Sequence, residues 1–177
     1  MPHQGREAAA AGLGHFNRAP VGPAEAALLA CCGSRRWAQR LVAHRPYPDL
    51  DSLLAAADEA SYDLSVEEIG DALARESSAG LRAGAPTSAQ TALRAAHAAY
   101  ESSFGHAFVI SLDGHRPTEQ LNQVLAGIRS RLGNEPDEER SVAADELRRL
   151  ARGRLAHLVA NHQELGDSPV SSCIAGP

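Results

Sequence analysis

The chain has 177 residues, which fits one domain, and a net charge of −5 argues against general electrostatic binding of nucleic acid. No stretch reaches the roughly 18 apolar residues that a membrane-spanning helix needs. Three cysteines without a CxxC pair form no disulfide framework, and no signal peptide is visible. We therefore expect a cytoplasmic protein that has neither a nucleic-acid partner nor a membrane partner.

Four helices are predicted in the first half of the chain from caps and apolar spacing. Ser34 and Asp49 each suit the position before a helix. Ser65 and Glu68 have the spacing of a capping box. The four predicted helices cover residues 23–32, 35–44, 50–60 and 66–75.

The second half predicts three more helices around one irregular segment. Thr87 or Ser88 suits the cap of a helix that runs to about residue 103. Pro117 and Pro136 suit the first turns of two further helices, the last of them covering residues 137–165.

Seven or so helices and no convincing strand predict an all-α fold, a compact single domain. The boundaries that we expect are a disordered N-terminus at 1–12, a helical domain at 13–166 and a loose tail at 167–177.

The segment YESSFGHAFVI, residues 100–110, differs from the alanine-rich helices around it. It contains two of the three phenylalanines, Phe104 and Phe108. Gly105 interrupts the preceding helical pattern just before an apolar run. The segment is either an irregular part of the core or a pocket wall whose backbone faces a ligand, and the segment alone does not decide between them.

Few residues have the spacing of a catalytic or metal site. His157 and His162 are five apart, which places them on different faces of a helix, so no metal site is predicted. His106, within the central segment, is either a locally hydrogen-bonded histidine or a general acid or base. Arg154 lies at the edge of an apolar helix face and needs an anionic partner, which is either a buried acid or a substrate carboxylate.

Several motifs follow one another in a familiar order. They are CCGSRRWA at 31–38, HRPYPDLDSLLAAA at 44–57, S-A-Q at 88–90, YESSFGHAFVI at 100–110 and LARGRLAHLV at 150–159. Together they resemble the family of OHCU decarboxylase (2-oxo-4-hydroxy-4-carboxy-5-ureidoimidazoline decarboxylase). That enzyme catalyses the third step from urate to (S)-allantoin.

The resemblance spans roughly residues 13–165 and implies an all-helical, cofactor-free lyase that is commonly a homodimer. Its substrate is a small-molecule carboxylate, and a His and a Glu serve acid–base chemistry. Arg154 matches the family's substrate-binding arginine, and Gln90 matches a glutamine of its pocket. The residues expected to form the substrate-facing wall are Phe104, Gly105, Phe108, Val109 and Ile110.

The sequence departs from the family pattern at two places. Glu76 stands where the catalytic His is expected, and no His lies between residues 45 and 96. Ala89 stands where the catalytic Glu is expected.

Three interpretations of these departures follow. The first is a decarboxylase-like lyase that uses Glu76 or His106 as the acid, acting on a ureido or heterocyclic carboxylate. The second is a catalytically silent paralogue that binds a small anion or a protein partner. The third is an ordinary family enzyme.

Overall fold

The computed structural model describes residues 3–78 and 86–161, and within these ranges the chain forms eight α-helices and no β-strand. The predicted all-α fold class is therefore confirmed. In the same ranges, no helix is both long and apolar enough to cross a membrane. The helices are α1 (His3–Arg18), α2 (Val21–Cys31), α3 (Arg35–Ala43), α4 (Leu50–Tyr62), α5 (Val66–Ala74), α6 (Thr87–Phe104), α7 (Pro117–Arg131) and α8 (Pro136–Ala160).

The predicted N-caps of α3, α4 and α5 are confirmed. The Ser34 hydroxyl accepts a hydrogen bond from the Trp37 amide, and the Asp49 carboxylate accepts one from the Ser52 amide. Ser65 and Glu68 form the reciprocal capping box that begins α5. Each cap satisfies backbone N–H groups that have no partner inside the helix, which is why the sequence signals these starts reliably.

Three helix boundaries differ from the sequence-based expectation. Helix α1, which the sequence analysis did not predict, spans His3–Arg18, because its alanine run favours helix and because Leu13 and Phe16 are buried in the core. Helix α6 has Pro86 as its N-cap without a side-chain cap, so Thr87 is its first helical residue. Helix α8 ends at Ala160 rather than at residue 165, and the predicted tail lies outside the described residues.

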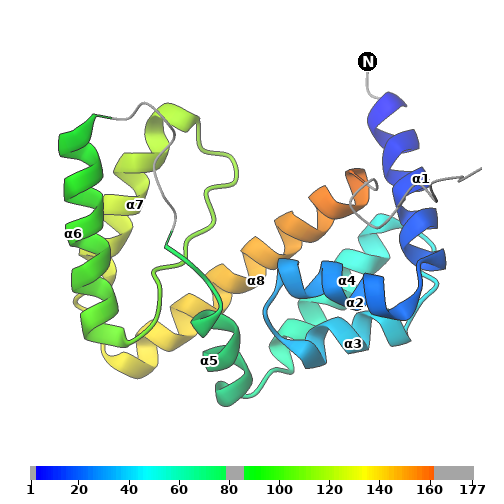
Figure 1. Cartoon of the computed structure of the whole chain (residues 1–177), viewed down its shortest axis with the longest axis horizontal. Helices are drawn as coiled ribbons and strands as arrows, with labels where there is room; N and C mark the ends of the chain where they lie inside the picture. Colours follow the sequence, from blue (N-terminus) through cyan, green and yellow to red (C-terminus); the bar gives the residue numbers. More distant parts are fainter. Residues whose placement is uncertain (1–2, 79–85, 162–177) are drawn as a thin grey trace, which may run out of the picture.

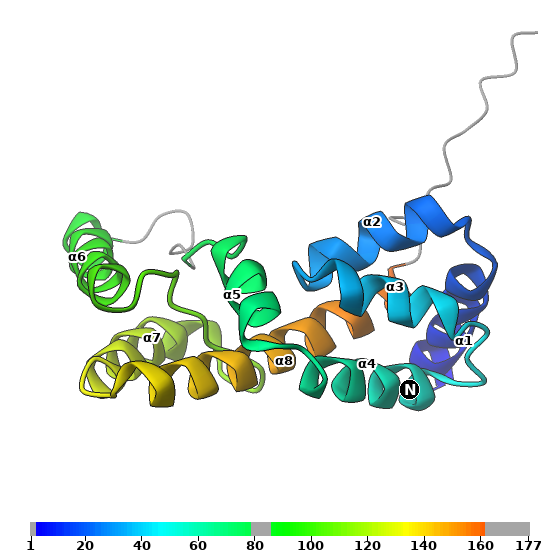
Figure 2. The same cartoon turned by 90° about the horizontal axis from the view of Figure 1, so that it is seen from below.

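The helices form two groups that α8 connects. Helix α8 packs against α1, α2, α4 and α5, whereas α6 and α7 pack on each other. Figures 1 and 2 show α6 and α7 at one end of the molecule and α1 to α4 at the other, with α8 running between them. Two hydrophobic clusters correspond to these groups, a larger one around α8 and a smaller one between α6 and α7.

The central segment joins the two clusters. Gly105 ends α6 in the left-handed conformation, with φ of 78°, so that the chain leaves the helix and becomes extended. Neighbouring side chains of an extended chain point in opposite directions. Phe108 is accordingly buried in the smaller cluster and Val109 in the larger one.

A buried polar network fastens this segment to three helices. Arg131 donates through Nη1 to the Val109 carbonyl at 2.7 Å, and through Nε and Nη2 to Glu139 Oε1 at 2.8 and 2.6 Å. Asn134 donates to Glu139 Oε2 at 2.9 Å. The Tyr100 hydroxyl also donates to Glu139, and burial followed by this hydrogen bond raises the pKa of Tyr100. The network leaves no polar atom of the Glu139 carboxylate without a partner, as a buried charge requires.

Candidate functional site

Arg154 and Glu76 form a bidentate ion pair in the candidate site. Arg154 Nη1 and Nη2 donate to the two Glu76 carboxylate oxygens at 2.8 and 2.9 Å. Nη1 also donates to the Cys31 carbonyl at the end of α2, at 3.2 Å. The Glu76 side chain is 10% exposed and that of Arg154 is 38% exposed. The hydrogen bond to Glu76 raises the pKa of Arg154, so the guanidinium stays charged. The anionic partner that the sequence analysis required is therefore, in this structure, an acid of the same chain.

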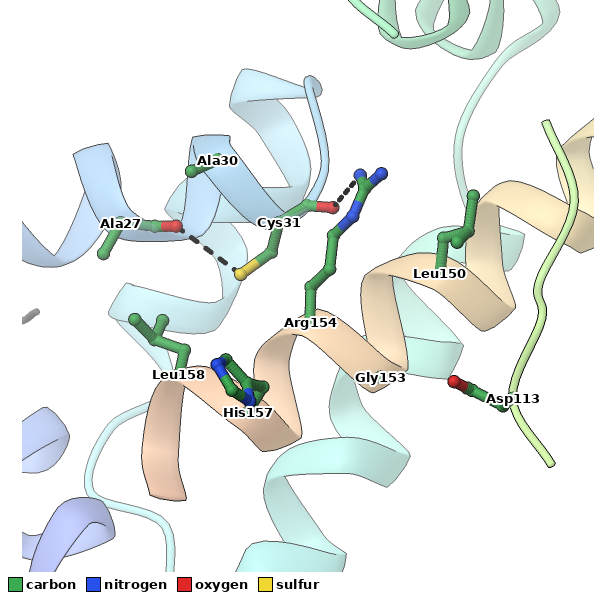
Figure 3. Close-up of a pocket in the computed structure, with 9 residues that line it drawn as sticks. All are labelled: Ala27, Ala30, Cys31, Asp113, Leu150, Gly153, Arg154, His157 and Leu158. Carbon is green, nitrogen blue, oxygen red and sulfur yellow. Dashed lines mark hydrogen bonds between the residues drawn. The ribbon is translucent and has the colours of Figure 1, made fainter. Parts of the chain in front are cut away.

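A cavity of about 460 Å³ lies beside the Arg154 side chain (Figure 3). One wall is a face of α8, whose lining residues are three or four positions apart and therefore lie on the same side of the helix. The other wall is formed by the C-terminal end of α2. The loop that follows the central segment contributes a single residue, Asp113. The lining residues are Ala27, Ala30, Cys31, Asp113, Leu150, Gly153, Arg154, His157 and Leu158.

A second cavity, of about 500 Å³, brings Glu76 and His106 together. Ser78 and Glu101 also line it, and the Ser78 hydroxyl donates to Glu101 at 2.6 Å. His106 Nδ1 lies 3.0 Å from the Ala107 carbonyl. Since a carbonyl only accepts hydrogen bonds, Nδ1 carries the proton and Nε2 is left to exchange one with a ligand. Glu76 therefore lines this second cavity and is ion-paired with Arg154, which lines the first.

The sequence analysis did not identify two polar residues of the Arg154 cavity. His157 lies three residues beyond Arg154 on α8, a spacing that could have identified it. Asp113 follows the central segment in the chain, and its only sequence signal was a turn. Within the described ranges, no group of three His, Cys, Asp or Glu side chains could hold a metal ion. Burial raises the pKa of the Cys32 thiol, which disfavours a reactive thiolate there.

The model of the OHCU decarboxylase family matches residues 17–82 and 71–156. These overlapping stretches cover more than half of the chain. The chain belongs to the OHCU decarboxylase family.

Two solved structures related to the OHCU decarboxylase family share the fold. The crystal structure of OHCU decarboxylase in the presence of (S)-allantoin is 22% identical, with a TM-score of 0.63, covering 75% of this chain and 96% of that one. The crystal structure of (S)-allantoin synthase is 18% identical, also with a TM-score of 0.63, covering 81% of this chain and 52% of that one. No curated protein matches the sequence closely enough to count as a relative.

The structure brings together only some of the residues that the resemblance to the OHCU decarboxylase family singled out. Gly105 and His106 share a cavity with Glu76, which holds Arg154. Gln90 lines neither cavity, and it lies about 22 Å from Gly105 along α6 at 1.5 Å per residue.

The expected substrate-facing wall is mostly part of the protein interior. Phe108 and Val109 are each 2% exposed, and the Val109 carbonyl is bound by Arg131. Phe104 and Ile110 are half-buried and pack against the smaller cluster. Of this segment, Gly105 and the neighbouring His106 are the predicted site residues that line the second of the two cavities described above.

Proposed function

We propose that this chain is a carboxy-lyase of the OHCU decarboxylase type with altered acid–base residues, acting on a ureido or heterocyclic carboxylate. The observation that supports this most directly is the bidentate ion pair between the Glu76 carboxylate and the Arg154 guanidinium. A guanidinium that binds one carboxylate in this way has the geometry to bind another. A substrate carboxylate would take over both hydrogen bonds once Glu76 moves aside. The ligand would then extend from Arg154 along the first cavity and also reach the second cavity, which Glu76 and His106 line.

The chemistry requires an electron sink and a proton donor. The bond between the carboxylate and the ring carbon breaks, CO₂ leaves, and the electron pair passes into an adjacent C=N or C=O group of the substrate. A proton must then reach that carbanion equivalent. In the proposal His106 supplies it from Nε2 in the doubly protonated imidazolium form, since Nδ1–H donates to the Ala107 carbonyl, and Nε2 takes up a new proton from water afterwards. Glu76 becomes available as an acid only after it leaves Arg154, since both of its oxygens accept hydrogen bonds there.

A catalytically silent protein that binds a small anion or a protein partner is the second candidate function. The specific observation in its favour is again the ion pair, since the charge of Arg154 is already neutralised by the chain itself. In addition, neither the His nor the Glu of the family pattern is present in the sequence.

The deciding experiment uses freshly prepared OHCU and follows (S)-allantoin by circular dichroism. The proposed lyase should form one enantiomer faster than the spontaneous reaction, and Arg154→Gln should abolish this. Arg152→Gln is the matched control, since Arg152 pairs with Asp58 instead and does not line the cavity. A wild type no faster than the spontaneous reaction would favour the silent protein, and Glu76→His with Ala89→Glu is then the informative back-substitution.

The role of His106 has its own test. His106→Asn should lower the turnover number roughly 10²-fold and remove one ionisation from the pH–rate profile, while the substrate affinity that Arg154 provides is retained. A pH–rate profile identical to that of the wild type would exclude His106 as the proton donor.

A further inference from the structure

Asp113 approaches α8 at the one residue of the cavity wall that has no side chain. Its Oδ2 atom lies 3.1 Å from the position that a Cβ would occupy on residue 153. Gly153 therefore permits this approach, and a larger residue would push the carboxylate away.

The Asp113 carboxylate and the Arg154 guanidinium line the same cavity from different elements. In Figure 3 the Arg154 side chain extends from α8 toward Cys31. Asp113 belongs to the loop after the central segment and lies beside Gly153, away from Cys31. Within residues 3–78 and 86–161, no hydrogen bond or ion pair involves the Asp113 side chain. Because Glu76 neutralises Arg154, Asp113 adds uncompensated negative charge to the wall. The other lining residues are small or apolar, apart from His157.

We propose that Asp113 determines ligand specificity in this cavity by selecting a carboxylate that also carries a terminal N–H donor, such as a ureido NH₂. The inference rests on the proposed function, in which Arg154 takes the carboxylate end of the ligand. A carboxylate accepts hydrogen bonds and cannot donate them, so it attracts N–H groups. It also repels a second anionic group, so that dianions are rejected by the same side chain.

Two small ligands isolate this preference. N-carbamoylglycine and N-acetylglycine have nearly the same shape and one carboxylate each, and they differ only in a terminal NH₂ against a methyl group. Titration calorimetry of the full chain at pH 7 should show that N-carbamoylglycine binds about tenfold more tightly, the size expected for one charge-assisted hydrogen bond at an exposed carboxylate. Arg154→Gln should weaken the binding of both ligands.

Substitutions on the two sides of the contact should remove the preference without removing binding. Asp113→Ala should bring the two affinities within about twofold of each other. Gly153→Ala should reduce the preference as well, since its Cβ would lie 3.1 Å from the Asp113 oxygen, while alanine favours the helix. Asp137→Ala, which removes a carboxylate with a 93% exposed side chain at the start of α8, is the control and should retain the wild-type preference.

The possible outcomes separate this inference from the function on which it rests. Equal affinity of the wild type for both ligands, with both dependent on Arg154, would overturn the role of Asp113 and leave the carboxylate site standing. A preference that persists in Asp113→Ala would also overturn it. Binding of neither ligand to the wild type would overturn the inference together with the proposed carboxylate site.

Discussion

Glu76 and Arg154 hold each other through two hydrogen bonds, although 78 positions separate them in the chain. The pair connects the loop after α5 with the face of α8 that lines the first cavity. Any ligand carboxylate that binds Arg154 must compete with this internal carboxylate. The strength of the ion pair therefore sets the affinity that an external anion can reach.

Replacing Glu76 by glutamine should strengthen ligand binding. A neutral amide holds the guanidinium less tightly than a carboxylate does, so the affinity for N-carbamoylglycine should rise about tenfold in titration calorimetry. Glu101→Gln is the control, because Glu101 lines the second cavity but pairs with Ser78. Weaker binding by Glu76→Gln would show instead that Glu76 itself contacts the ligand.

Removing Arg131 should destabilise the fold strongly. Arg131→Met leaves the fully buried Glu139 carboxylate without its cation and should lower the free energy of unfolding by about 3–5 kcal/mol. Arg140→Met removes an exposed pair with Asp137 and should cost no more than about 0.5 kcal/mol. Urea denaturation followed by circular dichroism measures both free energies of unfolding. Equal decreases in the two variants would contradict the prediction that the buried pair stabilises the fold more than the exposed one.

The stability of the protein should fall above pH 10, in part because of Tyr100. Its pKa is raised in the folded chain by burial and by the hydrogen bond to Glu139, whereas an unfolded tyrosine has a pKa of about 10. Above pH 10 the unfolded state therefore loses a proton that the folded state keeps. The contribution is present in full below pH 10 and decreases as the pH rises, by up to about 1.4 kcal/mol per pH unit.

Tyr100→Phe should make this alkaline loss of stability less steep. The measurement is the free energy of unfolding in urea between pH 9 and 11.5, a range in which no lysine titrates because the chain has none. Tyr62 is 67% exposed, so Tyr62→Phe is the control and should retain the wild-type slope. The same slope in Tyr100→Phe and wild type would contradict the prediction.

Gly127 allows α7 to lie close to the central segment. A Cβ there would lie 3.1 Å from the Phe108 ring and 3.2 Å from Ile110 Cδ1, so Gly127→Val should destabilise the protein by about 1–3 kcal/mol. Gly70→Ala, in the middle of α5 with no atom within 4 Å of the added Cβ, should stabilise it by about 0.5–1 kcal/mol. The midpoint of thermal unfolding distinguishes the two variants. A higher midpoint for Gly127→Val would show that Phe108 and Ile110 can move away from the added side chain at little cost.

The sequence alone determined the helices whose signals are local. Ser34, Asp49 and the Ser65–Glu68 pair act on backbone groups within three residues, so their effect does not depend on the rest of the fold. The position of Arg154 at the edge of an apolar face was determined in the same way, by helical spacing, and with it the need for an anionic partner. Helix α1 could not be predicted in this way, because the burial of Phe16 that supports it depends on distant helices.

Only the tertiary structure decided which groups meet. It paired Arg154 with Glu76, buried Arg131 against Glu139, and placed Asp113 opposite Gly153. These contacts depend on how α8 crosses the other helices and on the path of the central segment between two hydrophobic clusters. Helix periodicity specifies which face of a helix is apolar, but it does not specify which residue of another element that face will contact.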